Sequence, residues 1–171
     1  IIGILVGLVL LGCAVVALYI AMQGDAEMRL LTKKRTKAVK VSEQGDRLDF
    51  QLEVPFDNIG KQEGTILDVY MRIYLPQEQY DDVLLRGKVN LEGVLRDDDY
   101  FEALLVPAGT GKNLVLRFEA YAKHGKTLAE ALGNVPDVDV ALFADCRGRR
   151  ELYTVKEYFT LTAEEMRALV K

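Results

Sequence analysis

The residues that come closest to a known catalytic pattern form a glycine-rich stretch, Ala108-Gly109-Thr110-Gly111-Lys112. In a nucleotide-binding loop, glycine N–H groups surround phosphate oxygens. The pattern needs a glycine five positions before its last one, a Ser or Thr after the Lys, and a following helix. Here those two positions hold Val106 and Asn113, and the next residues alternate as in a strand. We therefore predict a hairpin turn and no nucleotide site.

Nucleophilic catalysis requires a serine or cysteine beside a histidine, and this sequence offers few candidates. It contains one histidine, His124, and one serine, Ser42; of its two cysteines, Cys13 lies in an apolar N-terminal segment. Cys146 has no local motif that pairs it with His124, and a zinc site normally takes three or four His or Cys ligands. We predict that the protein is not an enzyme, holds no metal or other cofactor, and forms no disulfide.

Acidic clusters are the remaining candidates for ligand binding, because carboxylate oxygens are ligands that Ca²⁺ prefers. None of them has the spaced twelve-residue pattern of a helix–loop–helix calcium site. We therefore expect solvated loops and keep calcium binding as an alternative. The clusters are Asp81-Asp82, Asp97-Asp98-Asp99, and Asp137 with Asp139 and Asp145.

Two tyrosines and an arginine lie on one face of the most regular predicted strand, residues 65–75. Tyr70, Arg72 and Tyr74 alternate with apolar residues and are expected to point outward. Tyr and Arg are enriched at interface hot spots, so we predict a partner-binding surface here; an ordinary sheet exterior is the alternative. The residues expected to face the core are Leu67, Val69, Met71, Ile73 and Leu75.

The elements that position these residues are mostly strands. Alternating apolar and polar residues begin at Leu48 and return in short stretches bounded by turn residues. This pattern favours an all-β fold, an immunoglobulin-like antiparallel β-sandwich, with a small β-barrel as the alternative. Thr162 and Glu165 form a capping box that predicts a short C-terminal helix over 163–171. The other predicted elements are strands at 48–54, 83–85, 88–95, 100–106, 113–122, 138–144 and 151–161, and a helix at 128–132.

Residues 1–22 contain no charged side chain and predict an N-terminal transmembrane helix. At about 1.5 Å per residue the helix would be about 33 Å long, enough for a hydrocarbon core of about 30 Å. A cleaved signal peptide would have a shorter apolar region and a small-residue cleavage site. Leu10-Leu11-Gly12-Cys13 resembles the box before a lipidated cysteine, but the residues up to Met22 remain apolar. We therefore expect a retained single-pass helix.

Three glycines are candidate contact points on this helix. Gly3 and Gly7 lie one turn apart, and we expect Gly12 to continue a strip of small residues that lets another helix approach closely. The alternative explanation is that glycine is simply frequent in transmembrane helices. The strip predicts other integral membrane subunits as partners.

A basic stretch follows the apolar segment, and we expect its side chains to lie on anionic lipid headgroups. The positive-inside rule would place the domain in the cytoplasm, but the rule compares two flanks, and long domains are exported largely regardless of charge. We therefore expect an extracytoplasmic domain and keep the cytoplasmic side open. The basic residues are Arg29, Lys33, Lys34, Arg35, Lys37 and Lys40.

Charge divides the chain into three predicted parts: a transmembrane helix at 1–23, a basic juxtamembrane connector at 24–46, and a soluble β domain at 47–171. Seven Lys or Arg oppose four Asp or Glu in residues 24–47, whereas fifteen oppose twenty-two in residues 48–171. Nucleic acid requires clustered Lys and Arg, so an acidic domain excludes it as an expected partner.

Together these features favour a non-catalytic accessory subunit of a larger membrane protein complex, such as a photosynthetic or respiratory assembly. A membrane-tethered binding module is the alternative, and it would recognise a soluble protein, a glycan or calcium through its loops.

Overall fold

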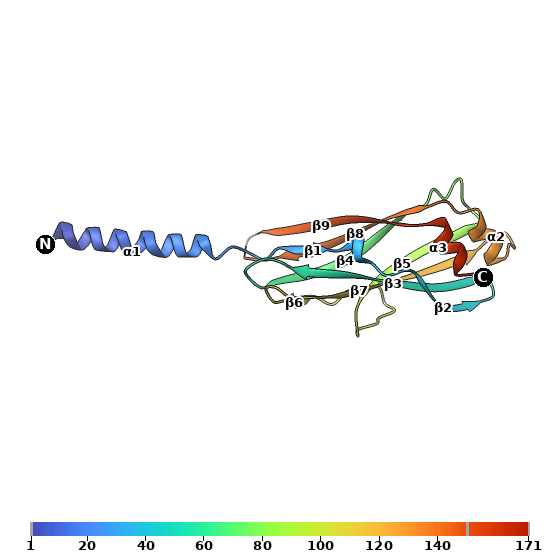
Figure 1. Ribbon diagram of the computed structural model, residues 1–171, viewed down its shortest axis with the longest axis horizontal. Coiled ribbons are helices and arrows are strands. Elements are labelled where there is room, and N and C mark those ends of the chain that lie inside the picture. The colour runs from blue at the N-terminus through green and yellow to red at the C-terminus, as the bar shows by residue number, and fades with distance from the viewer. Residues whose placement is uncertain (1, 150, 171) are drawn as a thin grey trace.

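An isolated helix and an elongated β domain make up the chain (Figure 1). The computed structural model describes residues 2–149 and 151–170; Ile1, predicted to begin the helix, lies outside them. The helix, α1 (Ile2–Met22), buries none of its side chains. It is the one described helix that is long and apolar enough to cross a membrane, and an N-terminal signal sequence has the same character.

Nine strands within the described residues form two antiparallel sheets, so the predicted all-β class is confirmed. The first sheet has the order β1-β3-β7-β5, with β2 also paired to β3, and the second has the order β6-β4-β8-β9. The first contains β1 (Met28–Leu30), β2 (Val39–Gln44), β3 (Arg47–Asn58), β5 (Val83–Leu91) and β7 (Gly111–Ala122). The second contains β4 (Gly64–Tyr74), β6 (Leu104–Val106), β8 (Val138–Arg147) and β9 (Leu152–Leu161).

The core lies between the two sheets and contains every second residue of most strands. Phe50 of β3 and Phe118 of β7 pair in register, and their rings stack with centroids 5.0 Å apart. Two short helices, α2 (Leu128–Gly133) and α3 (Ala163–Ala168), cover the end of the domain opposite α1 (Figure 1). Both predicted short helices are therefore present.

The helix caps differ in one detail from the prediction. Thr162 accepts a hydrogen bond from the Glu165 N–H, as expected, but the Glu165 carboxylate binds Arg35 and the Ala38 N–H instead of closing a capping box. The complete capping box belongs to Thr127 and Glu130 at α2. The Glu165 carboxylate, which the local sequence pattern assigned to the helix cap, therefore binds Arg35, an arginine far away in the sequence.

The stretch predicted as a connector, residues 24–46, belongs to the β domain. β1 and β2 both pair with β3, and a 3-10 helix, η1 (Thr32–Lys34), lies between them. A long strand has backbone groups on both edges that need partners, and this stretch supplies them. The side chains of β2 are mostly exposed on both faces, so no alternation marked it as a strand. The predicted boundary at residue 47 is wrong.

A β-bulge reverses the orientation of side chains near the start of β4. The register shifts between Ile66 and Asp68. Beyond the bulge the predicted alternation is correct, with Val69 buried and Tyr70 exposed. Before it, Ile66 is fully buried while Leu67 is 39% exposed, the reverse of the prediction. One extra residue shifts the two-residue period by one, which a sequence pattern alone does not reveal.

Two predicted interruptions are absent. β3 continues past Pro55, whose carbonyl accepts a hydrogen bond from the Leu31 N–H at the edge away from β7. Since the N–H and C=O of a strand residue point to the same side, the missing N–H removes no bond to β7. Gly87 lies inside β5, where it is paired with Phe118 of β7, and Met71 of β4 occupies the space that a side chain would fill. This contact brings the β4 and β5 edges together and closes one side of the sandwich like half a barrel.

Candidate functional site

The outer face of the second sheet carries aromatic rings and cations on three neighbouring strands. Tyr70 of β4, Phe143 of β8 and Lys156 of β9 are paired in register. Tyr158 lies two residues further along β9, opposite Ala141. We term this surface the aromatic–basic face; it consists of Tyr70, Arg72, Tyr74, Phe143, Lys156 and Tyr158.

Rings and cations of the aromatic–basic face contact one another. Tyr70 and Phe143 stack with centroids 5.0 Å apart. The Lys156 ammonium lies 5.1 Å from the Phe143 centroid and 4.8 Å from that of Tyr158, and the Arg72 guanidinium lies 5.9 Å from Phe143. These distances are typical of cation–π contacts. Tyr158 also raises the pKa of Lys156. Neither cation forms an ion pair with a carboxylate of the described chain.

The structure places the three predicted partner-surface residues, Tyr70, Arg72 and Tyr74, on this one exposed face. Sequence reasoning missed the other half of it, on β8 and β9. The sequence predicted strands at 138–144 and 151–161, but not that these strands lie beside β4. Whether the face binds a partner stays a prediction.

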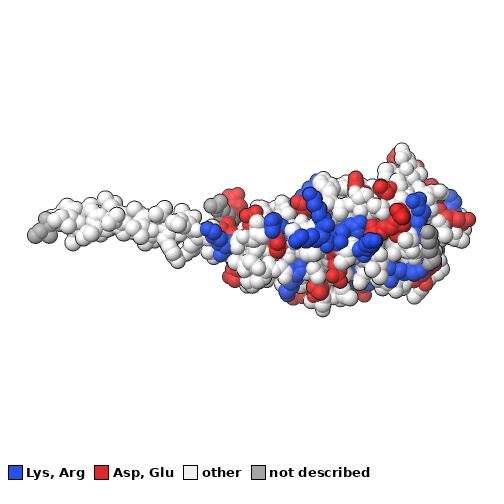
Figure 2. All heavy atoms as spheres, viewed as in Figure 1, with Lys and Arg blue, Asp and Glu red and all other residues white. Residues whose placement is uncertain are grey.

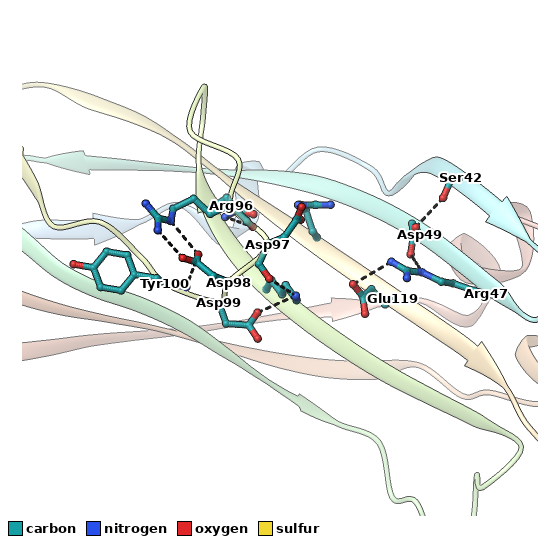
Figure 3. A network of polar contacts seen from close by, with 12 residues as sticks. Ser42, Arg47, Asp49, Arg96, Asp97, Asp98, Asp99, Tyr100 and Glu119 are labelled. Carbon is teal, nitrogen blue, oxygen red and sulfur yellow. Dashed lines mark hydrogen bonds and ion pairs between the residues drawn. The ribbon is translucent and has the colours of Figure 1, made fainter.

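Charged residues on the outer face of the first sheet pair with one another across strands (Figure 3). The Arg47 Nε lies 2.7 Å from Asp49, and its Nη2 lies 3.2 Å from Glu119. Ser42 donates a hydrogen bond of 2.7 Å to Asp49. Burial alone would raise the pKa of Asp49, but the bonds from Arg47 and Ser42 lower it. We term this set the charged ladder; it consists of Ser42, Arg47, Asp49, Lys88, Arg96, Asp97, Asp98, Asp99, Arg117 and Glu119.

Three aspartates of the loop after β5 belong to the charged ladder and bind three different cations. Asp97 pairs with Arg117 at 2.7 Å, Asp98 with Arg96 at 2.5 Å, and Asp99 with Lys88 at 3.3 Å. Hydrogen bonds from Arg96 lower the pKa of Asp98 to about 2. Calcium binding at this loop would require the carboxylates to leave these cations.

The candidate nucleophiles, Ser42 and Cys146, have different surroundings. Ser42 binds Asp49, and Cys146 is buried on β8, where burial raises its pKa to about 12. Among the described residues, Asp81, Asp82 and His124 have ligand atoms within 4.8 Å of one another. The His124 Nε2 lies 3.3 Å from Asp81, and Lys126 binds Asp82 at 2.5 Å. Sequence spacing did not place His124 beside these aspartates. The lysine already supplies the positive charge that a metal would bring.

The glycine-rich stretch 108–112 is a turn, although it does not form a hairpin. It connects β6 of the second sheet to β7 of the first. Gly109 has a positive φ of 69°, and a side chain on Gly111 would overlap the Phe56 carbonyl. Asn58 donates its N–H to the Thr110 carbonyl. Close backbone contact explains the glycines without a phosphate ligand.

The three predicted helix-contact glycines lie on two different faces of α1. Gly3 and Gly7 differ by about 40° around the helix, because each residue turns it by about 100°. Gly12 is about 140° beyond Gly7, so it does not continue their strip. It instead lines a shallow groove with Val9, Cys13, Val16, Ala17 and Ile20. All three glycines face open space.

The basic residues predicted at the membrane surface run along the domain, away from α1. Arg29 pairs with Asp57 at 3.1 Å, and Lys40 with Glu43 at 2.9 Å. Figure 2 shows Lys and Arg gathered over the middle of the domain. The turn after β2 lies at the end opposite α1 (Figure 1). The segment between β1 and β2 contains three exposed lysines, Lys33, Lys34 and Lys37. Strand pairing of 28–44 with β3 thus separates them from the helix that they follow in sequence.

Arg35 is the exception among these basic residues because it is mostly buried. Its guanidinium lies 2.8 Å from the Glu165 carboxylate and donates a second bond of 2.8 Å to the Thr160 carbonyl. It also lies over the Phe159 ring at 5.5 Å. Arg35 therefore joins the N-terminal part of the domain to α3, and its role at a lipid surface stays a prediction.

No family model matches the chain, and no curated protein matches it. Solved structures that resemble it include a Bordetella pertussis protein provisionally named ApaA, with 14% identity, a TM-score of 0.49, and coverage of 80% of this chain and 94% of that one. The GAE domain of yeast GGA1 is 8% identical, with a TM-score of 0.39 and coverage of 79% and 98%. A FixG-related protein from Vibrio parahaemolyticus is 12% identical, with a TM-score of 0.34 and coverage of 80% and 94%. At these values the likeness supports no functional argument.

Proposed function

We propose that the protein is a non-catalytic accessory subunit of a membrane protein complex, anchored by α1 and docked on a neighbour through the aromatic–basic face. The observation that carries this proposal is that α1 buries none of its residues against its own domain. In water such an apolar surface is unstable, so lipid or another helix must cover it.

The aromatic–basic face supports a protein as the second contact. Tyr70, Tyr74 and Tyr158 are 38%, 47% and 54% exposed. Large rings with a polar end, together with Arg, are the residue types that contribute most to protein interfaces. Arg72 and Lys156 leave N–H donors available to the partner.

The anchor is tested by isolating the full chain with its partners from native membranes in mild detergent. Gly3→Leu with Gly7→Leu introduces bulk on the face where another helix would approach, so co-purified membrane subunits should fall to background. The matched control is Gly12→Leu, which adds the same bulk on the other face. Unchanged co-purification in the double variant would contradict helix packing through Gly3 and Gly7.

Retention of the helix is a separate measurement. The intact mass of the mature protein from membranes should include α1. A mature chain that begins after Met22 would identify α1 as a cleaved signal sequence and overturn the anchor. The proposed extracytoplasmic location is tested by protease treatment of sealed vesicles, in which only an outward-facing domain is cut.

A membrane-tethered binding module is the second candidate, and the loops at the end opposite α1 favour it. There Asp81, Asp82 and His124 converge on an exposed surface. In this case the domain alone would retain its ligand. The domain to express is residues 25–171, because β1 and β2 belong to it. Calcium that leaves its melting temperature unchanged relative to a chelated sample would exclude calcium as the ligand.

We also propose that the β domain is an immunoglobulin-like sandwich. That fold has one sheet of order A-B-E-D and one of strands C, F and G. When β1, β3, β4, β5, β7, β8 and β9 are lettered A to G, the observed sheets read A-B-E-D and C-F-G. β2 and β6 are additions at strands B and C. Continuous backbone hydrogen bonds between β4 and β5, detected by NMR, would close the barrel and contradict this assignment.

A further inference from the structure

The turn between β8 and β9 contacts the residues that follow α1. The Arg149 N–H donates a hydrogen bond of 2.7 Å to the Asp25 carboxylate, and the Arg149 guanidinium donates one of 3.2 Å to the Gln23 side chain. Gln62, in the turn between β3 and β4, donates a bond of 3.3 Å to the Gln23 carbonyl. The chain that leaves α1 is therefore held against this end of the domain (Figure 1).

The length of α1 sets the height of this turn above a membrane. Its 21 residues, at about 1.5 Å each, span about 32 Å, which matches a hydrocarbon core of about 30 Å. The headgroup layer beyond the core is about 5–8 Å deep on each side. Gln23 lies one residue past the helix, so the Arg149 guanidinium that binds it lies at headgroup level. This step rests on the proposed anchor.

A groove of about 930 Å³ lies beside the chain at this level, and charged side chains of both signs line it. They are Arg147 and Arg149 on one hand and Asp25, Glu27 and Glu151 on the other. Both arginines and both glutamates are exposed, and none of the four forms an ion pair within residues 2–149 and 151–170. Opposite charges thus share one groove without neutralising one another, and they remain available to a ligand.

The mixture of charges favours a ligand that also carries both signs. Three carboxylates oppose two guanidinium groups, so the groove does not favour a simple anion. A zwitterionic lipid headgroup offers a phosphate, which arginine binds through charge-assisted and often bidentate hydrogen bonds, and an ammonium, which carboxylates bind. Leu152 lines the same groove and is 58% exposed, so it supplies an apolar contact for the acyl chains.

We propose that this groove binds the headgroup of a zwitterionic phospholipid, with the phosphate on Arg147 and Arg149 and the ammonium on Glu27 and Glu151. The site is separate from the aromatic–basic face. It assigns lipid contact to side chains from β8 and β9 that are far from α1 in sequence and that the fold brings to its end.

Two lipids that share a phosphate and acyl chains, phosphatidylethanolamine and phosphatidylglycerol, test the choice of headgroup. The full chain in non-ionic detergent receives equal amounts of both, and native mass spectrometry counts the lipid that each protein molecule retains. Phosphatidylethanolamine should be retained about threefold more often, the factor expected for one exposed charge contact. Glu27→Gln with Glu151→Gln should abolish this preference. Equal retention by the unaltered chain would overturn the proposal, and so would an undiminished preference in the double variant.

The phosphate contact has its own variant and a matched control. Arg147→Gln with Arg149→Gln should reduce retention of both lipids at least about fivefold. Lys33→Gln with Lys37→Gln removes two exposed cations outside the groove and should leave retention unchanged. Wild-type retention in the arginine variant would contradict the site. No retained lipid in the unaltered chain would mean that the groove holds solvent only.

The height of the groove is measured separately, with the ¹⁵N-labelled full chain in lipid nanodiscs. A lipid with a gadolinium-bearing headgroup should broaden the Arg149 amide signal and leave that of His124, at the opposite end, sharp. If the amides of α1 exchange freely with water, the helix is not inserted, and the anchor and this proposal both fail. If α1 is protected while the Arg149 signal stays sharp, the anchor stands and this proposal alone is overturned.

Discussion

The two sheets use charge differently on their outer faces. On the first sheet, the cations of the charged ladder bind carboxylates of the same chain, as Arg47 does with Asp49 and Glu119. On the second sheet, Arg72 and Lys156 lie on aromatic rings and bind no carboxylate of the described residues. A cation over a ring keeps its N–H donors available, whereas one in an ion pair has committed at least one of them to the carboxylate. The charged groups on the outer face of the first sheet are thus paired within the chain, whereas those on the second sheet are suited to binding a partner.

The inner faces of the two sheets do not differ in this way, because both bury apolar residues in the core. A substitution there should have the largest effect on stability. Phe118→Ala should lower the free energy of unfolding by about 3–5 kcal/mol, since Phe118 is 1% exposed and stacks on Phe50. Urea denaturation followed by circular dichroism measures the loss. Leu95→Ala, at an exposed position, is the control. A loss below about 1 kcal/mol would mean that the ring is not in a packed core.

The outer face of the second sheet should affect binding more than stability. Arg72→Ala with Tyr158→Ala is expected to weaken partner association by about 2 kcal/mol or more, the loss typical of a hot spot. Quantitative recovery of partner subunits in mild detergent, across a dilution series, measures it. The unfolding midpoint should change little. A large loss of stability with unchanged recovery would mean that this face, like the first, serves the fold.

Glu165 tests the partly buried ion pair that joins Arg35 to α3. Burial would raise the pKa of this carboxyl, but the bonds from Arg35 and the Ala38 N–H outweigh burial and lower it. The carboxylate therefore stabilises the fold above its ordinary pKa of 4.5, and this stabilisation is lost as the pH falls through the lower folded-state value. Glu165→Gln should cost about 2 kcal/mol at pH 7.

Unfolding of wild type and of Glu165→Gln, measured across pH, tests whether the pKa of Glu165 is lowered in the folded state. The difference in unfolding free energy between wild type and Glu165→Gln should shrink from pH 5 downward, over the range that the lowered pKa defines. Asp98, whose pKa is about 2, keeps its charge over most of that range and is not the source of the change. A difference that stays constant with pH would contradict the ion pair with Arg35.

The charged ladder should give the smallest effect. Arg117→Gln removes one exposed pair, with Asp97 87% exposed, and exposed pairs contribute about 0–1 kcal/mol. The difference from wild type should disappear in 1 M salt, because the Debye length there is about 3 Å. Recovery of partners should not change. Loss of partners in this variant would assign a binding role to the first face and remove the contrast between the sheets.

The aromatic–basic face and the buried Asn90 illustrate how far each feature could be predicted. Alternation within residues 65–75 predicted that Tyr70, Arg72 and Tyr74 share one exposed side, because side chains alternate along any strand. The addition of Phe143 and Lys156 depends on strand order, which no single stretch encodes. Asn90 lies in a predicted strand without any distinguishing pattern, and only the loop that covers it leaves its Oδ1 without a partner.

Sequence alone determined the features that depend on neighbours within a few residues. These are the apolar helix over residues 2–22, the alternating strands, and the Thr162 cap. Tertiary structure decided where distant segments meet: that residues 28–44 extend the first sheet, that Arg35 binds Glu165, and that His124 lies beside Asp81. The reason is physical, since local periodicity follows from backbone geometry, whereas strand register and buried pairs depend on which surfaces fit together across the whole core.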